Sequence, residues 1–225
     1  MYADWYEGAA NRPAMLVLIG KTSSKMRFTE RVSYLSKSTG FSALVLDYSG
    51  HGVSPFELDD ITPAQHFIEV VAAYDYMKLL APQAKVVVFG TSYGGYFSSL
   101  LPSFRTVDAL VLRVPAVYPP EIFYTKSRDI DTDHIRSVYR TDQDNFMNHP
   151  DLEKLKIFKG PSLVVSHELD DVCPKPVTDA YIRVLRADSF DQPGFKHSES
   201  QTSPEQAVIH AYLDKITAWL NSLPK

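Results

Sequence analysis

The feature that most restricts the fold of this chain is a run of mostly β-branched residues that ends in Gly-x-Ser-x-Gly. Residues 86–96 read Val-Val-Val-Phe-Gly-Thr-Ser-Tyr-Gly-Gly-Tyr, and a helix-compatible stretch continues to Leu101. A strand that turns sharply into a helix at such a motif lifts its serine above the sheet, an arrangement called a nucleophile elbow. We expect a side chain at Gly90 or Gly94 to collide with neighbouring backbone, and Ser92 to be strained. An ordinary Gly-rich turn is the alternative.

Apolar runs typical of β-strands alternate with helical patterns along the chain. The near-continuous apolar character of these runs suits parallel strands that are buried on both faces. The alternation predicts an α/β fold, a doubly wound, mostly parallel sheet of about six core strands with helices on both faces. The expected strands are residues 14–19, 43–47, 85–89, 109–114, 162–166 and, with a weaker pattern, 187–190.

Two of the expected helices carry start signals. Residues 62–65 read Thr-Pro-Ala-Gln, which predicts an N-cap threonine, a proline in the first turn and a glutamine that closes a capping box. Residues 203–206 read Ser-Pro-Glu-Gln and repeat this signature before the last helix. Apolar residues recur at helical spacing after each signature and predict one buried face. A further helix is expected over residues 26–38.

The length and composition of the chain suit a single α/β domain over residues 1–225, of which 44% are hydrophobic. A net charge of −4 and an isoelectric point near 6.0 give no electrostatic reason to expect nucleic acid or an anionic membrane as a partner. The apolar runs are far shorter than the roughly 20 residues of a membrane helix, so no membrane span is expected.

The cysteine content and the first residues indicate a reduced compartment. Cys173 is the only cysteine, which excludes a disulfide framework and a thiolate zinc cluster. The N-terminus is acidic and aromatic, unlike the basic start of a signal peptide, so a cytoplasmic protein is expected unless an export sequence was removed upstream. No metal is expected, because the cluster of His167, Glu168, Asp170 and Asp171 lacks a recognised ligand spacing.

Residues 116–158 break the alternation of strands and helices. They have no clean hydrophobic period and are rich in aromatic and charged side chains. Because a connector does not need so many residues, we interpret them as a small lid or cap over the strand ends. An irregular surface insertion without substrate contact is the alternative. Tyr118, Phe123 and Tyr124 are candidates for lining a substrate pocket, although packing of the lid on the sheet explains them equally well.

Four segments resemble motifs of the α/β-hydrolase superfamily. Residues 90–96 are close to the elbow of its peptidase branch, and residues 47–54 (Asp-Tyr-Ser-Gly-His-Gly-Val-Ser) resemble its Asp-x-x-Gly-x-Gly-x-Ser loop. Residues 168–174 (Glu-Leu-Asp-Asp-Val-Cys-Pro) resemble the acid loop Glu-x-Asp-x-x-x-Pro. Residues 19–25 (Ile-Gly-Lys-Thr-Ser-Ser-Lys) resemble the oxyanion loop His-Gly-Phe-Thr-Gly-Ser-Lys. Over nearly its full length the chain is similar to small esterases, to proteins like acylglycerol lipases and dienelactone hydrolases, and to the catalytic domain of prolyl-oligopeptidase-type peptidases.

The resemblance implies a catalytic triad. A serine hydroxyl needs a base to remove its proton, and the base needs a partner that fixes its tautomer. In the family, the acid and then the histidine follow the serine, each in a loop after a later strand. The resemblance therefore implies Ser92 as the nucleophile, Asp170 as the acid and His197 as the base. The adjacent Asp171 is the rival of Asp170.

The oxyanion loop departs from the family pattern. The resemblance implies an oxyanion hole formed by the backbone N–H groups of Lys21 and Tyr93, and backbone donors tolerate a change of side chain. The family's His-Gly is Ile-Gly in this chain, and the Lys21 side chain is expected to crowd or charge the acyl site. His167 stands where the family has a glycine before the acid-loop glutamate. The two N-terminal antiparallel strands of the full fold are expected to be largely missing.

The remaining histidines have weaker signals. His51 lies in a Gly-His-Gly loop, where a loop-packing role is favoured over that of a base. Packing or solvent exposure is the default for the histidines without motif context, which are His66, His134, His149 and His210.

The expected function is that of a cofactor-free serine hydrolase acting on a small-molecule carboxylic ester. Val172 joins the three lid aromatics as a candidate substrate-binding residue. Peptide or amide hydrolysis is the first alternative, suggested by the amino-acid sequence of the elbow, residues 90–96. A non-catalytic binding protein on the same fold is the second, suggested by the altered oxyanion loop. The sequence gives no prediction of the oligomeric state.

Overall fold

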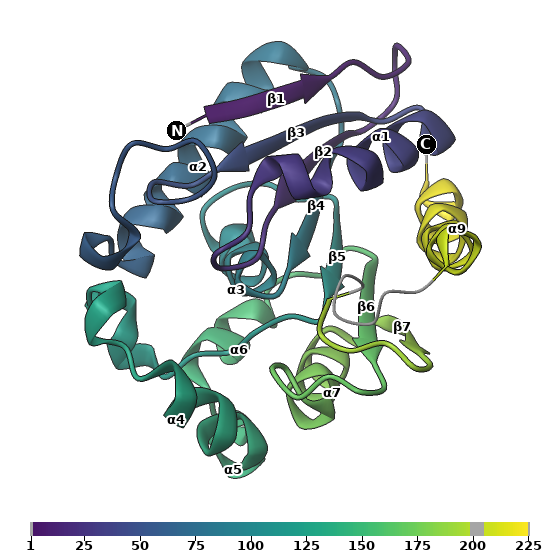
Figure 1. The fold of residues 1–225 in the computed structure, drawn as a ribbon. Coiled ribbons are helices and arrows are strands. Elements are labelled where there is room, and N and C mark those ends of the chain that lie inside the picture. Colours follow the sequence, from purple (N-terminus) through teal and green to yellow (C-terminus); the bar gives the residue numbers. More distant parts are fainter. Residues whose placement is uncertain (1, 199–204, 225) are drawn as a thin grey trace.

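The structure is a computed structural model that describes residues 2–198 and 205–224. A seven-stranded sheet forms its centre (Figure 1). The strand order is β1-β3-β2-β4-β5-β6-β7, and all neighbouring strands are parallel except β1 and β3. The strands are β1 (Tyr2–Tyr6), β2 (Ala14–Leu18), β3 (Ser42–Asp47), β4 (Val86–Thr91), β5 (Ala109–Arg113), β6 (Ser162–His167) and β7 (Asp188–Gln192).

The α/β fold class and the six expected strands are confirmed. The observed bounds of β2 to β7 differ from the expected ones by no more than two residues at either end. Every residue of β2, β4, β5 and β6 is buried, so both faces of the centre of the sheet are covered. This burial explains why the strands read as continuous apolar runs instead of alternating patterns.

Strand β1 corrects the expectation that the N-terminal antiparallel strands are largely missing. It pairs with β3 along its whole length, from Tyr2 opposite Asp47 to Tyr6 opposite Ala43. Because β1 lies at the edge of the sheet, its side chains are exposed or half-buried and give no apolar run to detect. An ion pair of 2.7 Å between Asp4 and Lys25 ties it to the loop after β2.

Helices pack in two groups beside the sheet (Figure 1). Helices α1 and α9 contact each other, whereas in a second group α6 contacts both α3 and α7. Their bounds are α1 (Thr29–Thr39), α2 (Pro63–Leu80), α3 (Tyr93–Leu100), α6 (Pro150–Leu155), α7 (Lys175–Leu185) and α9 (Gln206–Ser222).

The predicted start of α2 is confirmed, and that of α9 is described only in part. The N–H of Gln65 donates to Thr62 Oγ1 over 3.2 Å, and the N–H of Thr62 donates to Gln65 Oε1 over 2.8 Å. This reciprocal pair is the expected capping box. The cap expected at Ser203 and Pro204 lies outside the described residues. The helix expected over residues 26–38 begins as a 3-10 turn, Lys25–Phe28, and continues as α1.

Residues 116–158 contain short helices and no strand in the structure (Figure 1). The α-helices among them are α4 (Thr132–Ser137), α5 (Asp144–Met147) and α6. The segment packs against α2 through the 3-10 turn Pro120–Tyr124, where the rings of Phe123 and Phe67 are 6.1 Å apart. Its missing hydrophobic period follows from the shortness of these helices, since one or two turns cannot display a repeat.

None of the helices formed by the described residues combines the length and the apolar composition that are needed to span a bilayer.

Two glycines allow α3 to cross the sheet closely. A Cβ at Gly94 would lie 2.2 Å from the carbonyl oxygen of Leu18 in β2, and a Cβ at Gly90 would lie 2.5 Å from the carbonyl oxygen of Gly94. Both clashes involve backbone, which cannot rotate away as a side chain can. The expected collision at these two positions is therefore confirmed.

We expect Gly94→Ala to lower the free energy of unfolding by about 3 kcal/mol, because β2 and α3 must separate to admit the methyl group. Gly20→Ala is the matched control, since a Cβ there meets nothing closer than 3.7 Å. Urea denaturation of both variants measures the difference. Equal stability of the two variants would contradict this account of the crossing.

Candidate active site

Ser92 forms the sharp turn between β4 and α3. Its backbone has φ 53° and ψ −113°, a left-handed conformation that a residue with a side chain rarely adopts. The surrounding backbone holds this turn, because the Ser92 N–H donates to the carbonyl of Arg113 over 3.0 Å. In turn, the Ser92 carbonyl accepts from the N–H groups of Tyr96 and Ala116 over 3.1 and 3.0 Å. The strained conformation expected from the sequence is confirmed.

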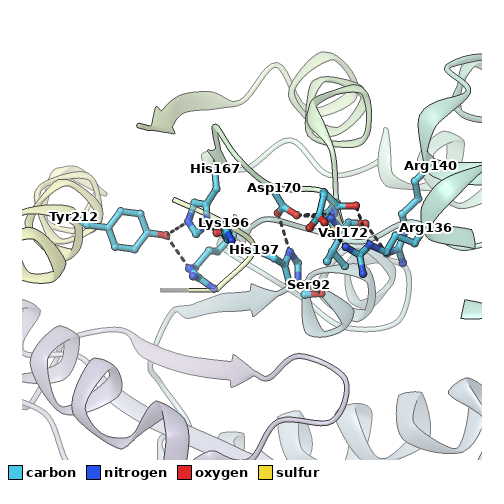
Figure 2. Close-up of polar contacts among 12 residues, drawn as sticks. Ser92, Arg136, Arg140, His167, Asp170, Val172, Lys196, His197 and Tyr212 are labelled. Carbon is cyan, nitrogen blue, oxygen red and sulfur yellow. Dashed lines mark hydrogen bonds and ion pairs between the residues drawn. The ribbon is translucent and has the colours of Figure 1, made fainter. Parts of the chain in front are cut away.

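Ser92, His197 and Asp170 form one hydrogen-bonded series (Figure 2). His197 Nε2 lies 2.9 Å from Ser92 Oγ, and His197 Nδ1 lies 2.8 Å from Asp170 Oδ2. The three residues follow β4, β7 and β6, whose carboxyl ends meet at one edge of the parallel sheet. With the Nδ1 proton donated to the carboxylate, Nε2 is left to accept the hydroxyl proton of Ser92.

The second oxygen of Asp170 is held by its own loop. Asp170 Oδ1 accepts from the N–H groups of Val172 and Cys173, each over 2.8 Å. Burial by itself would raise the pKa of Asp170, but the hydrogen bonds from His197, Cys173 and Val172 outweigh it and hold that pKa below its usual value. The carboxyl group therefore stays ionised and can orient the imidazole.

Asp171, the rival acid, points elsewhere. Its side chain is 70% exposed and pairs with Arg136, whereas the Asp170 side chain is 1% exposed. The structure brings Asp170, and not Asp171, to His197 (Figure 2).

A polar network that the sequence analysis missed supports the loop of His197. His167 Nδ1 lies 2.6 Å from the carbonyl oxygen of Lys196, the residue before His197. His167 Nε2 lies 3.2 Å from the hydroxyl of Tyr212, which accepts a hydrogen bond of 2.8 Å from Arg113 Nε. Figure 2 shows His167 between Lys196 and the ring of Tyr212. His167 thus links β6 to α9 and to the loop of His197.

The two candidate oxyanion donors lie beside Ser92. Tyr93 is the first residue of α3, so its N–H has no acceptor within the helix. Gly20 precedes Lys21 and lies against Ser92, because a Cβ at Gly20 would be 3.7 Å from the Cβ of Ser92. Lys21 and Ser92 also line the same cavity.

Two buried histidines support these donors. The N–H of Thr22 donates to His51 Nε2 over 3.1 Å, and His51 Nδ1 lies 3.2 Å from the carbonyl oxygen of Ser49. His66 Nε2 lies 2.8 Å from the same oxygen, and His66 Nδ1 lies 2.9 Å from the hydroxyl of Tyr93. The packing role expected for His51 agrees with these contacts, and the site-supporting position of His66 had no signal in the sequence beyond its place in α2.

Both histidines are held neutral. Burial lowers the pKa of His51, and burial lowers the pKa of His66 to about 4. A neutral His51 can accept from Thr22 because Nε2 keeps its lone pair. Protonation would remove this acceptor next to the oxyanion loop.

A cavity of about 720 Å³ opens at the triad. Ser92, His197 and Lys21 line it together with residues from α9 and from the segment that starts α1. The sequence analysis did not identify these further lining residues, which include Arg27, Phe28, Arg31, Tyr34, Ile209 and Leu213.

The four candidate substrate-binding residues differ in position. Tyr118 is buried, with its ring 5.8 Å from that of Tyr93. Phe123 packs on α2, Tyr124 is 80% exposed, and Val172 is half-buried in the acid loop. They do not line the cavity of Ser92 and His197 in the described part of the chain.

Within residues 2–198 and 205–224, no group of three or more His, Cys, Asp or Glu side chains has the arrangement of a metal site.

The comparisons with known proteins agree with the fold. A family model described as alpha/beta hydrolase fold matches residues 13–170. Est1E from Butyrivibrio proteoclasticus, solved with bound ferulic acid, is 18% identical, with a TM-score of 0.71 over 98% of this chain and 92% of that one. A monoacylglycerol lipase from Paleococcus ferrophilus is 15% identical, with a TM-score of 0.68 over 98% of each chain. At these identities the likeness concerns the fold. A search of curated protein sequences gave no match.

The lowered pKa of His66 predicts a loss of stability in acid. Between about 4 and 6.5 the unfolded chain binds a proton at this residue that the folded chain does not, so the free energy of unfolding falls as the pH falls through this range. We expect His66→Gln to flatten that slope. The matched control is His134→Gln at an exposed site, and urea titrations at several pH values measure all three proteins. An unchanged slope for His66→Gln would contradict the assignment.

Proposed function

We propose that this chain, which belongs to the alpha/beta hydrolase fold family, is a serine hydrolase that cleaves small carboxylic esters through an acyl-enzyme on Ser92. The observation that carries the proposal is the unbroken hydrogen-bonded series from Asp170 Oδ2 through His197 to Ser92 Oγ. An ionised, buried carboxylate, an imidazole hydrogen-bonded to it and a hydroxyl on a strained turn are the parts that acyl transfer requires.

Formation of the acyl-enzyme follows from the two hydrogen bonds of His197, to Asp170 and to Ser92. Ser92 Oγ attacks the ester carbonyl while His197 Nε2 accepts its proton. Asp170 stabilises the resulting imidazolium through the proton at Nδ1. The imidazolium then returns the proton to the departing alkoxide, and an alcohol leaves.

Release of the acid repeats these steps with water. His197 takes a proton from a water molecule, which attacks the acyl carbonyl. The imidazolium then returns this proton to Ser92 Oγ as its bond to the acyl group breaks, and the acid leaves. In both halves the carbonyl oxygen becomes negative, and the N–H groups of Lys21 and Tyr93 are the donors that we assign to it. One such donor is typically worth about 3 kcal/mol of transition-state stabilisation.

Esters are proposed before amides because one of the similar structures is a monoacylglycerol lipase. We assign residues 116–158 the role of a lid, and their contact with the acid loop supports it. Arg136, from this segment, donates to the carbonyl of Asp171 over 3.2 Å, and Arg140 donates to the carbonyl of Val172 over 2.9 Å.

A fluorophosphonate probe should label the wild-type chain and not Ser92→Ala, because the probe reacts with an activated serine. Ser92→Ala should lower kcat on p-nitrophenyl butyrate by about 10⁶-fold. The wild type should cleave this ester much faster than aminoacyl anilides. A preference for the anilides would move the assignment to a peptidase, and an unlabelled wild type would indicate a binding protein.

Asp170→Asn should lower kcat by roughly 10⁴-fold, because an amide does not stabilise the imidazolium and favours the wrong tautomer. Asp171→Asn is the matched control and should change kcat by less than about threefold, since its carboxylate lies at the surface with Arg136. Steady-state rates on one ester measure both variants. A larger loss in Asp171→Asn would reverse the assignment of the acid.

A further inference from the structure

The loop after β2 contains a strained turn. Residues 20–23 form this turn, which is closed by a hydrogen bond of 3.2 Å from the N–H of Ser23 to the carbonyl of Gly20. Thr22, the third residue, has φ 61°, whereas Lys21, the second, has no positive φ. This combination marks a type II turn, whose third residue is normally glycine or asparagine. A β-branched residue there is a genuine outlier, so the surrounding structure must hold it.

The turn fixes one of the two donors that we assign to the oxyanion. The N–H of Lys21 belongs to the same peptide plane as the carbonyl of Gly20, which accepts from Ser23. The orientation of this N–H therefore depends on the conformation of the turn. If Thr22 relaxes to a negative φ, the next peptide plane rotates and the turn changes its type. The Lys21 N–H then loses the arrangement that fixes it.

His51 holds the strained residue from a separate loop. The N–H of Thr22 donates to His51 Nε2 over 3.1 Å, and His51 Nδ1 lies 3.2 Å from the carbonyl oxygen of Ser49. A carbonyl accepts and a backbone N–H donates, so the proton of the ring is on Nδ1 and the lone pair is on Nε2. The Thr22 N–H has no second acceptor among residues 2–198 and 205–224.

The ring of His51 is itself fixed by its neighbours. Only 2% of the residue is exposed, and the ring centres of Tyr48 and His66 lie 5.3 and 5.1 Å from that of His51. The carbonyl of Ser49 also accepts from His66 over 2.8 Å, and the N–H of Ser49 donates to Glu69 over 2.8 Å. Helix α2, which carries His66 and Glu69, thus keeps the imidazole in place.

We propose that His51 is a positioning residue of this site, whose neutral imidazole holds residues 20–23 in the strained form that presents the Lys21 N–H to the oxyanion. The inference rests on the proposed function and adds to it a residue that acts through the turn and not on the substrate. If His51 only filled space between β3 and α2, an apolar ring of similar size would serve equally well.

The charge of His51 decides whether it can accept from the turn. Burial has the largest effect on the pKa of His51 and lowers it. The carbonyl of Ser49 and the carboxylates of Asp47 and Glu69 raise this pKa, and the charge of Lys21 lowers it. The net result is a pKa below the ordinary value for histidine, so the ring is neutral at neutral pH. A protonated ring would present an N–H to the donor of the turn and release it.

The first test separates the acceptor from the ring. His51→Phe keeps an aromatic ring without the acceptor, whereas His51→Gln keeps an acceptor that does not titrate. On p-nitrophenyl butyrate, His51→Phe should lower kcat by at least about tenfold and change KM by less than about threefold, because the oxyanion forms only in the transition state. His51→Gln should keep kcat within about threefold of the wild type.

The matched control is His134→Phe at an exposed residue, which should keep the wild-type kcat. Equal kcat for His51→Phe and the wild type, in a protein whose Ser92 is labelled by fluorophosphonate, would overturn the inference and leave the proposed function intact.

A second substitution tests the strain at Thr22. Glycine adopts a positive φ as readily as a negative one, so Thr22→Gly should hold the turn when the acceptor is missing. The double variant His51→Phe/Thr22→Gly should have a kcat at least about fivefold higher than His51→Phe alone. His51→Phe/Ser24→Gly is the matched control, because Ser24 has φ −144° in extended backbone and glycine gains nothing there. Equal kcat for the two double variants would contradict the role of the strained turn.

The pH dependence of kcat gives a readout that a space-filling role would not change. Wild-type kcat should fall more steeply in acid than that of His51→Gln, because His51 and His197 must both be neutral in the wild type and only His197 in the variant. Steady-state rates from about pH 4.5 to 8 measure both proteins, while circular dichroism confirms that they stay folded. Parallel acid limbs would overturn the inference.

A measurement without substrate tests the contact itself. Nitrogen-15 NMR should show the His51 ring protonated on Nδ1, and the amide signal of Thr22 should titrate in the wild type and not in His51→Gln. This result without labelling of Ser92 would support the role of His51 in the turn and contradict the hydrolase. A neutral ring protonated on Nε2 would overturn the inference.

Discussion

The close crossing of α3 over β2 and β4 is the constraint on which the rest of the site depends. The helix approaches so closely that the positions of Gly90 and Gly94 have no room for a methyl group. The chain must then turn within a single residue, and Ser92 takes the left-handed backbone conformation that this turn requires. Strain at one residue is tolerated because three backbone hydrogen bonds fix the turn from both sides. The hydroxyl is therefore aimed by the backbone, before any side chain acts on it.

The other parts of the site are separate loops that polar contacts tie to this fixed point. Val172 and Cys173 hold one oxygen of Asp170, and His167 holds the carbonyl of Lys196, the residue before His197. The histidine pair His51 and His66 connects the loop of Lys21 and Thr22 with the hydroxyl of Tyr93. Each loop thus has a buried partner that fixes it, which favours a preorganised site over one assembled by the substrate.

Residues 116–158 are attached to the loop that holds Asp170. Arg136 donates to the carbonyl of Asp171, and Arg140 donates to the carbonyl of Val172.

The sequence by itself determined the features that depend on neighbouring residues. The strands β2 to β7, the capping box of Thr62 and the elbow at Ser92 follow from local patterns of apolar residues, caps and glycines. The order of serine, acid and histidine followed from the family resemblance. Only the tertiary structure decided which aspartate meets His197, since Asp170 and Asp171 are adjacent and differ in where the loop turns them. Only the tertiary structure shows that β1 pairs with β3, that His167 contacts Tyr212 and that Arg140 donates to the carbonyl of Val172. These contacts join residues far apart in the chain and leave no local pattern.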